Sequence, residues 1–129
     1  MTAPFPIRQI AEERGLRLFK EEGYDSVPRA ERDWYLELRG RGGVLYPHDA
    51  TSFWVDTTSG KAASYAAIPH ERALVSPDGR EARFLFLADA LDAALRELRP
   101  RKKRVLSDEQ RQLLIERLAA SRFRAGRFA

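Results

Sequence analysis

The chain has 129 residues and a formal net charge of +4, and 43% of its residues are hydrophobic and 33% charged. This length fits one domain, and the hydrophobic content is too high for a disordered chain. The absence of cysteine excludes disulfides and thiolate metal sites, and no apolar run approaches the length of a membrane span. We therefore expect a small cytoplasmic protein with no membrane segment and no cofactor.

Apolar residues at helical spacing predict an opening helix that begins at Ile7 and ends near Gly23. Gly15, in the middle of this helix, lowers its stability by about 1 kcal/mol relative to Ala, so the helix can break there. Residues 7–16 also resemble the first helix and turn of a helix-turn-helix motif. The following segment, 17–22, is too short to be the recognition helix that such a motif requires.

The next part of the chain has the pattern of β-structure. Residues 34–38 alternate between apolar and polar in the manner of a half-buried strand. Gly40-Arg41-Gly42-Gly43 predicts a tight turn, after which residues 44–46 continue as a second strand. Residues 52–56 predict a third strand.

A short alanine-rich helix at residues 62–68 follows these strands. Two strands at residues 73–75 and 81–87 form the clearest hairpin, because the Pro-Asp-Gly sequence between them is typical of a turn. A helix at residues 88–99 comes next, with acidic residues near its start and basic residues near its end, as the helix dipole favours.

These elements predict an α+β fold, with an antiparallel or mixed sheet of about five strands and helices packed on one face. This body spans residues 1–99. A proline and four consecutive cations then begin a basic extension over residues 100–129. We expect a linker at residues 100–106 and a final helix at about 107–121, because a Ser and a Gln three residues apart form a capping box at its start.

The net charge is distributed unevenly along the chain. Residues 99–129 hold ten Lys or Arg and three Asp or Glu, whereas residues 1–98 hold thirteen basic and sixteen acidic side chains, a balance of +7 against −3. A basic extension on a mildly acidic body can be attracted to a polyanion while the body contacts something else.

The basic and aromatic residues of the extension are the candidate binding residues. Cations neutralise phosphates and release counterions, and phenylalanine rings stack on unpaired bases. The pattern predicts a non-enzymatic accessory protein that contacts nucleic acid (RNA or DNA) or a nucleoprotein complex, mainly through phosphates. The candidate residues are Arg99, Arg101, Lys102, Lys103, Arg104, Arg111, Arg122, Phe123, Arg124, Arg127 and Phe128.

One alternative is protein binding. In this hypothesis the chain is a small inhibitor or adaptor, of phage or mobile-element type, that acts on a host complex. An acidic protein surface could also attract the basic extension. One face of the sheet would supply the aromatic side chains that anchor such a partner: Trp34, Tyr35, Phe53 and Trp54.

A second alternative is a small basic ribonuclease or toxin. It would use His48 or His70, the two histidines of the chain, with a nearby arginine. If the two rings met in space, they could form a general acid–base pair. Their spacing does not match a metal-binding motif, and no catalytic or cofactor-binding residue is assigned.

Overall fold

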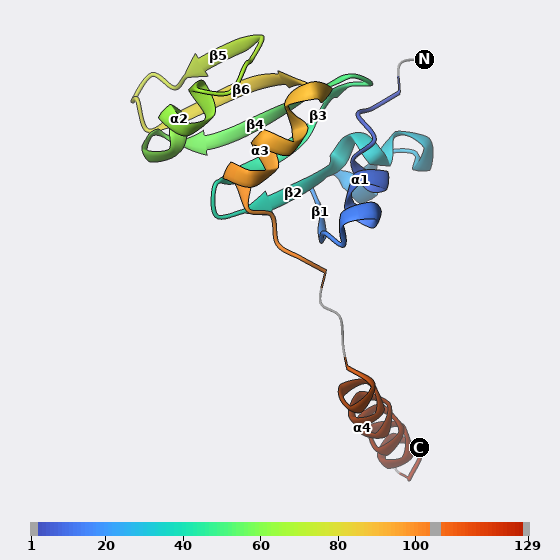
Figure 1. Ribbon diagram of the computed structural model, residues 1–129. Helices are drawn as coiled ribbons and strands as arrows, with labels where there is room; N and C mark the ends of the chain where they lie inside the picture. Colours follow the sequence, from blue (N-terminus) through green and yellow to red (C-terminus); the bar gives the residue numbers. More distant parts are fainter. Residues whose placement is uncertain (1–2, 104–106, 128–129) are drawn as a thin grey trace.

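The fold is centred on a six-stranded sheet. The computed structural model describes the backbone of residues 3–103 and 107–127, and the side chains of residues 3–103 and 107–120. Neighbouring strands are antiparallel throughout, in the order β1-β2-β3-β4-β6-β5 (Figure 1). The strands are β1 (Leu18–Lys20), β2 (Leu36–Gly40), β3 (Gly43–Asp49), β4 (Ser52–Thr58), β5 (Arg72–Val75) and β6 (Glu81–Leu87). The expected α+β class and antiparallel sheet are confirmed.

Helices cover one face of this sheet. They are α1 (Ile7–Arg14), α2 (Ser59–Ala66) and α3 (Leu91–Leu98). The chain also contains α4 (Asp108–Arg127) and the short 3₁₀ helices η1 (Tyr24–Ser26), η2 (Arg29–Tyr35) and η3 (Ala88–Ala90). Ile7 of α1, Tyr65 of α2 and Leu98 of α3 lie in one buried cluster with strand residues such as Phe53 and Phe86. Because α1, α2 and α3 share this core, the other face of the sheet remains uncovered by them.

The opening helix is shorter than the sequence predicts. It ends at Arg14, because Gly15 adopts the left-handed conformation at φ 63° and caps the helix. The Leu16 N–H then donates to the carbonyl of Ala11 at 2.8 Å, which turns the chain away from the helix axis. Residues 18–20 form β1 beside β2. The expected helix up to Gly23 is therefore wrong, and a strand stands where a recognition helix would follow.

Most other elements agree with the expected order, with shifted ends. Residues 34 and 35 belong to η2, so the strand predicted there begins two residues later. The hairpin of β5 and β6 is confirmed, and Gly79 in its turn has a φ of 71°. Asp78 Oδ1 accepts hydrogen bonds from the Ser76 hydroxyl at 2.6 Å and the Arg80 N–H at 3.1 Å, which fixes the turn.

Residues 100–103, which we call the inserted segment, lie between the end of β2 and the residues that precede β1. On one side, the Arg101 N–H donates to the carbonyl of Arg39 at 2.9 Å. On the other side, the Arg17 N–H donates to the carbonyl of Arg101 at 2.9 Å, and the Lys103 N–H to that of Gly15 at 2.8 Å. The first residues of the expected linker are therefore hydrogen-bonded to the body on both sides.

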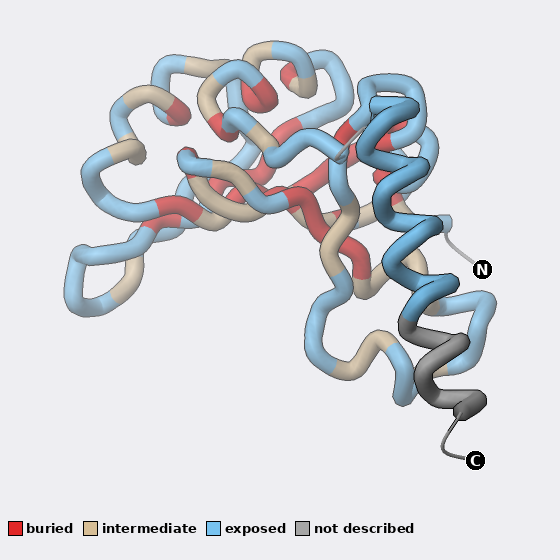
Figure 2. Tube along the Cα trace, turned by 90° about the horizontal axis from the view of Figure 1, so that it is seen from below, coloured by how far each residue is buried: buried red, intermediate tan, exposed pale blue. Residues whose placement is uncertain are grey.

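Helix α4 follows residues 104–106, which lie outside the described part of the chain. Its start has the predicted capping box: the Ser107 N–H donates to Gln110 Oε1 at 3.1 Å, and the Gln110 N–H to the Ser107 hydroxyl at 3.2 Å. Every residue from 107 to 120 is exposed (Figure 2). Among the described residues, no helix combines the length and apolar character needed to cross a membrane.

Candidate functional site: a cationic groove on the open sheet face

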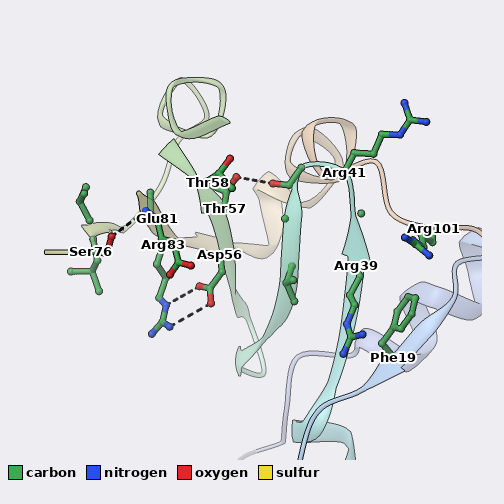
Figure 3. Close-up of a pocket in the computed structure, with 17 residues that line it drawn as sticks. Phe19, Arg39, Arg41, Asp56, Thr57, Thr58, Ser76, Glu81, Arg83 and Arg101 are labelled. Atoms are coloured by element: carbon green, nitrogen blue, oxygen red, sulfur yellow. Dashed lines mark hydrogen bonds and ion pairs between the residues drawn. The ribbon is translucent and has the colours of Figure 1, made fainter. Parts of the chain in front are cut away.

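The uncovered face of the sheet carries an open groove of about 770 Å³ (Figure 3). It runs from Phe19 and Arg101 at one end, across β2, β3, β4 and β6, to the end of β5. Four arginines and two carboxylates are among its lining residues: Arg39, Arg41, Arg83, Arg101, Asp56 and Glu81.

Arg41 stands on a rigid turn between β2 and β3. The neighbouring Gly42 donates its N–H to the carbonyl of Leu98 at 2.9 Å, and its own carbonyl accepts the hydroxyls of Thr57 at 2.7 Å and Tyr65 at 3.0 Å. Burial raises the pKa of Tyr65 well above its usual value, so the hydroxyl keeps the proton that it donates. The turn is thus fixed to both α2 and α3, and Arg41 projects from it (Figure 3).

The ring of Phe19 lies beside two arginines at the cationic end of the groove. The guanidinium carbon of Arg39 is 4.7 Å from the centre of the ring, and that of Arg17 is 4.8 Å away. These are cation–π distances. Arg39 also donates to Glu37, with its Nε 3.2 Å from Oε2, and this places the guanidinium beside the ring.

A second arginine–aromatic group lies further along the sheet. Arg83 Nε is 2.8 Å from Asp56 Oδ1, and its guanidinium carbon is 5.9 Å from the ring centre of Tyr46 and 5.8 Å from that of Trp54. The Tyr46 hydroxyl donates to the same Asp56 oxygen at 3.0 Å. Burial, followed by the charge of Asp56, raises the pKa of Tyr46 well above its usual value. The hydrogen bond to Asp56 raises the pKa of Arg83.

The cations at the Phe19 end differ from Arg39 and Arg83 in having no carboxylate partner. Within the described residues, no Asp or Glu lies within ion-pair distance of these side chains, and all of them are exposed. Their charge is therefore available to an external anion. They are Arg17, Arg41, Arg99, Arg101, Lys102 and Lys103.

The inserted segment brings part of the predicted binding set to this groove. Arg101 lines it, and Lys102 and Lys103 continue the exposed basic surface from the same segment. Arg99 ends α3 in the left-handed conformation at φ 49°. Arg111 is exposed on α4 and is not among the groove residues.

The remaining predicted residues are described less fully. Four of them belong to α4, but their side chains lie outside the described part of the chain: Arg122, Phe123, Arg124 and Arg127. Arg104 and Phe128 lie outside the described residues altogether.

Comparisons with protein-family models, with curated proteins and with solved structures found no match to this chain. We therefore argue its function from its own side chains and charges.

The aromatic residues of the protein-binding alternative do not form one exposed cluster. Phe53 is fully buried in the core, whereas Trp54 lies on the open face beside Arg83. Trp34 and Tyr35 belong to η2, before β2 begins. Placing adjacent residues of a strand on one face was wrong, because successive side chains of a strand point to opposite faces.

The two histidines also lie on opposite faces of the sheet. His48 packs on Trp54 on the open face, and its Nδ1 accepts the indole N–H at 2.9 Å. His70 packs on Phe84 of the core, with 5.3 Å between ring centres. The acid–base pair considered for a ribonuclease is therefore not formed. Within the described residues, no group of three or more His, Asp or Glu is placed to hold a metal ion.

Four residues of this face that matter most were absent from the predicted set: Arg17, Phe19, Arg39 and Arg83. The last three line the groove, and Arg17 packs on the ring of Phe19. The assignment of residues 7–23 to one helix hid the strand that carries Phe19. The signal for Arg39 and Arg83 was present, because each is separated by two positions from another residue of the open face, Glu37 and Leu85 respectively.

Proposed function

We propose that this protein is a non-enzymatic accessory protein that binds nucleic acid, RNA or DNA, or a nucleoprotein complex, mainly through phosphates. The observation that carries this proposal is the position of Arg101. Its backbone is hydrogen-bonded next to Arg39, so the basic run of the C-terminal region continues into the groove. A cytoplasmic location is part of the same proposal.

The electrostatics support a phosphate ligand over a neutral one. Arg39 and Arg83 are already paired with carboxylates, whereas Arg17, Arg41 and Arg101 have no such partner within the described residues. A row of exposed cations on a rigid surface attracts a polyanion and releases its condensed counterions. Arginine is well suited to this task, because its planar guanidinium group binds phosphate oxygens in pairs.

A salt titration tests the proposal. The affinity for fluorescein-labelled oligonucleotides should fall about a thousandfold between 50 and 200 mM salt, as for about six phosphate contacts. The variant Lys102→Ala/Lys103→Ala should reduce the slope of log K against log salt by about 2. Arg29→Ala/Lys61→Ala, which removes the same charge outside the groove, is the matched control. No binding at 50 mM salt, or equal slopes for the two variants, would overturn the proposal.

Protein binding is the second candidate function, and α4 is the observation that favours it. Large apolar side chains there are about half exposed: Leu113, Leu114, Ile115 and Leu118. Contact with a protein would remove them from water. A chain ending at residue 106 should then lose binding to purified ribosomal particles, a nucleoprotein, while keeping its affinity for free oligonucleotides. If the shortened chain lost the same affinity for ribosomal particles and for free oligonucleotides, protein binding by α4 would be rejected.

A further inference from the structure

We propose that the open sheet face takes unpaired nucleotides, with bases stacking on Phe19, Tyr46 and Trp54 and phosphates binding to the neighbouring arginines. This inference rests on the proposed function and narrows it from any nucleic acid to a single strand. It gives a role in base stacking to the aromatic side chains of the open face, which have no role in phosphate binding.

The strand register places aromatic side chains and arginines in adjacent rows. Tyr46 of β3 lies opposite Trp54 of β4, and Trp54 lies opposite Leu85 of β6. Phe19 lies at the β1 end of the same face, opposite Glu37. A strand advances about 3.3 Å per residue, so the row two residues further along a strand lies about 7 Å away.

The second row consists mainly of charged side chains. Arg39 of β2 lies opposite Val44 of β3, Val44 opposite Asp56 of β4, and Asp56 opposite Arg83 of β6. The guanidinium groups of Arg39 and Arg83 both lean back over the aromatic row, at the cation–π distances given above. Rings and cations therefore alternate within reach of a bound nucleotide.

The exposure of the rings supports a ligand on this face. Phe19, Tyr46 and Trp54 are each only partly buried, whereas aromatic residues on the opposite face of the sheet, such as Phe53 and Phe84, are buried in the core. Partly exposed rings retain apolar surface that a stacked base can cover. Base stacking on an aromatic side chain contributes about 1–3 kcal/mol per base and requires no particular sequence.

The charge of the groove explains how a strand would be held. Arg17, Arg41 and Arg101 gather at the Phe19 end, while Asp56 and Glu81 lie toward β6. Figure 3 shows Arg39 and Arg101 near Phe19 at this end of the groove. A backbone of phosphates is therefore attracted most strongly there. Phosphates can also replace Glu37 and Asp56 as partners of Arg39 and Arg83, because a guanidinium binds either group in the same geometry.

A single strand fits this face better than a duplex. In a duplex the faces of the bases are covered by their neighbours, so rings on a flat sheet cannot reach them. Unpaired bases expose both faces, and a sheet with aromatic side chains can stack two or three of them. An acidic protein would use the cations but would gain nothing from base stacking.

The experiment compares four ligands of equal length at 150 mM salt: single-stranded RNA, single-stranded DNA, the same DNA with abasic sites at its central positions, and the duplex. We expect the intact single strands to bind about tenfold more tightly than the abasic strand and the duplex. The RNA and DNA arms distinguish the two sources of unpaired nucleotides. Equal affinity of the abasic and intact strands would overturn stacking, while a steep salt dependence would leave the proposed function standing.

Two protein variants add an independent readout. Phe19→Ala should weaken binding of the intact strand about tenfold and leave the abasic strand unaffected. Leu113→Ala, at an exposed apolar residue of α4 and not on the sheet face, is the control. In a Trp34→Phe background Trp54 is the one remaining tryptophan, and stacking should quench its fluorescence. No quenching by a saturating single strand, or equal quenching by polyglutamate, would count against the inference.

Discussion

The backbone N–H of Arg101 donates to the carbonyl of Arg39, and through this bond a C-terminal segment becomes part of the sheet. The two residues are 62 positions apart in the chain, and their side chains line the same groove. The hydrogen bond to the sheet therefore fixes the start of the basic C-terminal region beside the groove.

Arg101→Pro should destabilise the body, because proline has no N–H to donate to Arg39. We expect a loss of about 0.5–1.5 kcal/mol in the free energy of unfolding, because one backbone hydrogen bond to the sheet is lost. Arg101→Ala removes the same charge but keeps the N–H, so its stability should match the parent chain. Urea denaturation of the three proteins measures the difference, and equal midpoints for the Pro and Ala variants would contradict it.

Two shortened chains should show that the inserted segment, and not α4, contributes to the stability of the body. A chain ending at residue 106 should keep the melting temperature of the full chain, because residues 107–120 are exposed. A chain ending at Arg99 lacks the segment that bonds to residues 15, 17 and 39, so it should melt several degrees lower. If both shortened chains melted at the same temperature as the full chain, the inserted segment would have no structural role.

Gly42→Ala should be strongly destabilising. A Cβ at this position would lie 2.1 Å from the carbonyl oxygen of Glu97 and 2.7 Å from the Tyr65 hydroxyl, so the turn and α3 would have to separate. A loss of about 2–4 kcal/mol is expected. In Gly60→Ala, by contrast, the Cβ would meet a single atom at 4.0 Å, and stability should be unchanged or slightly higher. Thermal melts of both variants test this contrast.

Glu21→Gln should stabilise the protein at neutral pH. Burial, followed by repulsion from Glu37 and Asp56, raises the pKa of Glu21 above its usual 4.5. The fold therefore favours the protonated carboxyl, and the associated stability is present below pH 4.5 and lost as pH rises through the raised pKa. The Gln variant should melt higher than the parent at pH 7 and equally at pH 3.5.

The control for this prediction is Glu22→Gln, which removes the same charge from the next residue, whose side chain is exposed like that of Glu21. Its melting temperature should change little at either pH. A shift of Glu21→Gln that is the same at pH 7 and pH 3.5 would show that the carboxyl does not repel Glu37 and Asp56.

Local patterns predicted most of the fold, and long-range contacts supplied the rest. The Pro-Asp-Gly turn and the capping box at Ser107 each depend on residues within a few positions, so the sequence indicated them correctly. Gly15 was identified as a possible break, but helical spacing on both sides favoured a continuous helix. Residues 18–20 instead form a strand because they pair with β2, and that pairing depends on residues about twenty positions away.

The candidate site was predicted only in part, for a similar reason. Clustering of cations identified Arg101, Lys102 and Lys103, but clustering along the chain cannot show which strands lie beside them. The groove joins residues from β1 to β6 with the inserted segment. Period-two alternation in β4 already separated Phe53 from Trp54, and applying it would have placed Trp54 outside the core.

The contacts of the inserted segment can form only late in translation. Residues 15–17 are made early, yet their hydrogen-bonding partners at 101–103 emerge from the ribosome only after nearly all of the body. The β1 edge thus stays incomplete until translation is far advanced, and such distant contacts form slowly. Nascent chains of this protein should remain open to proteases at that edge until the basic residues arrive and close it.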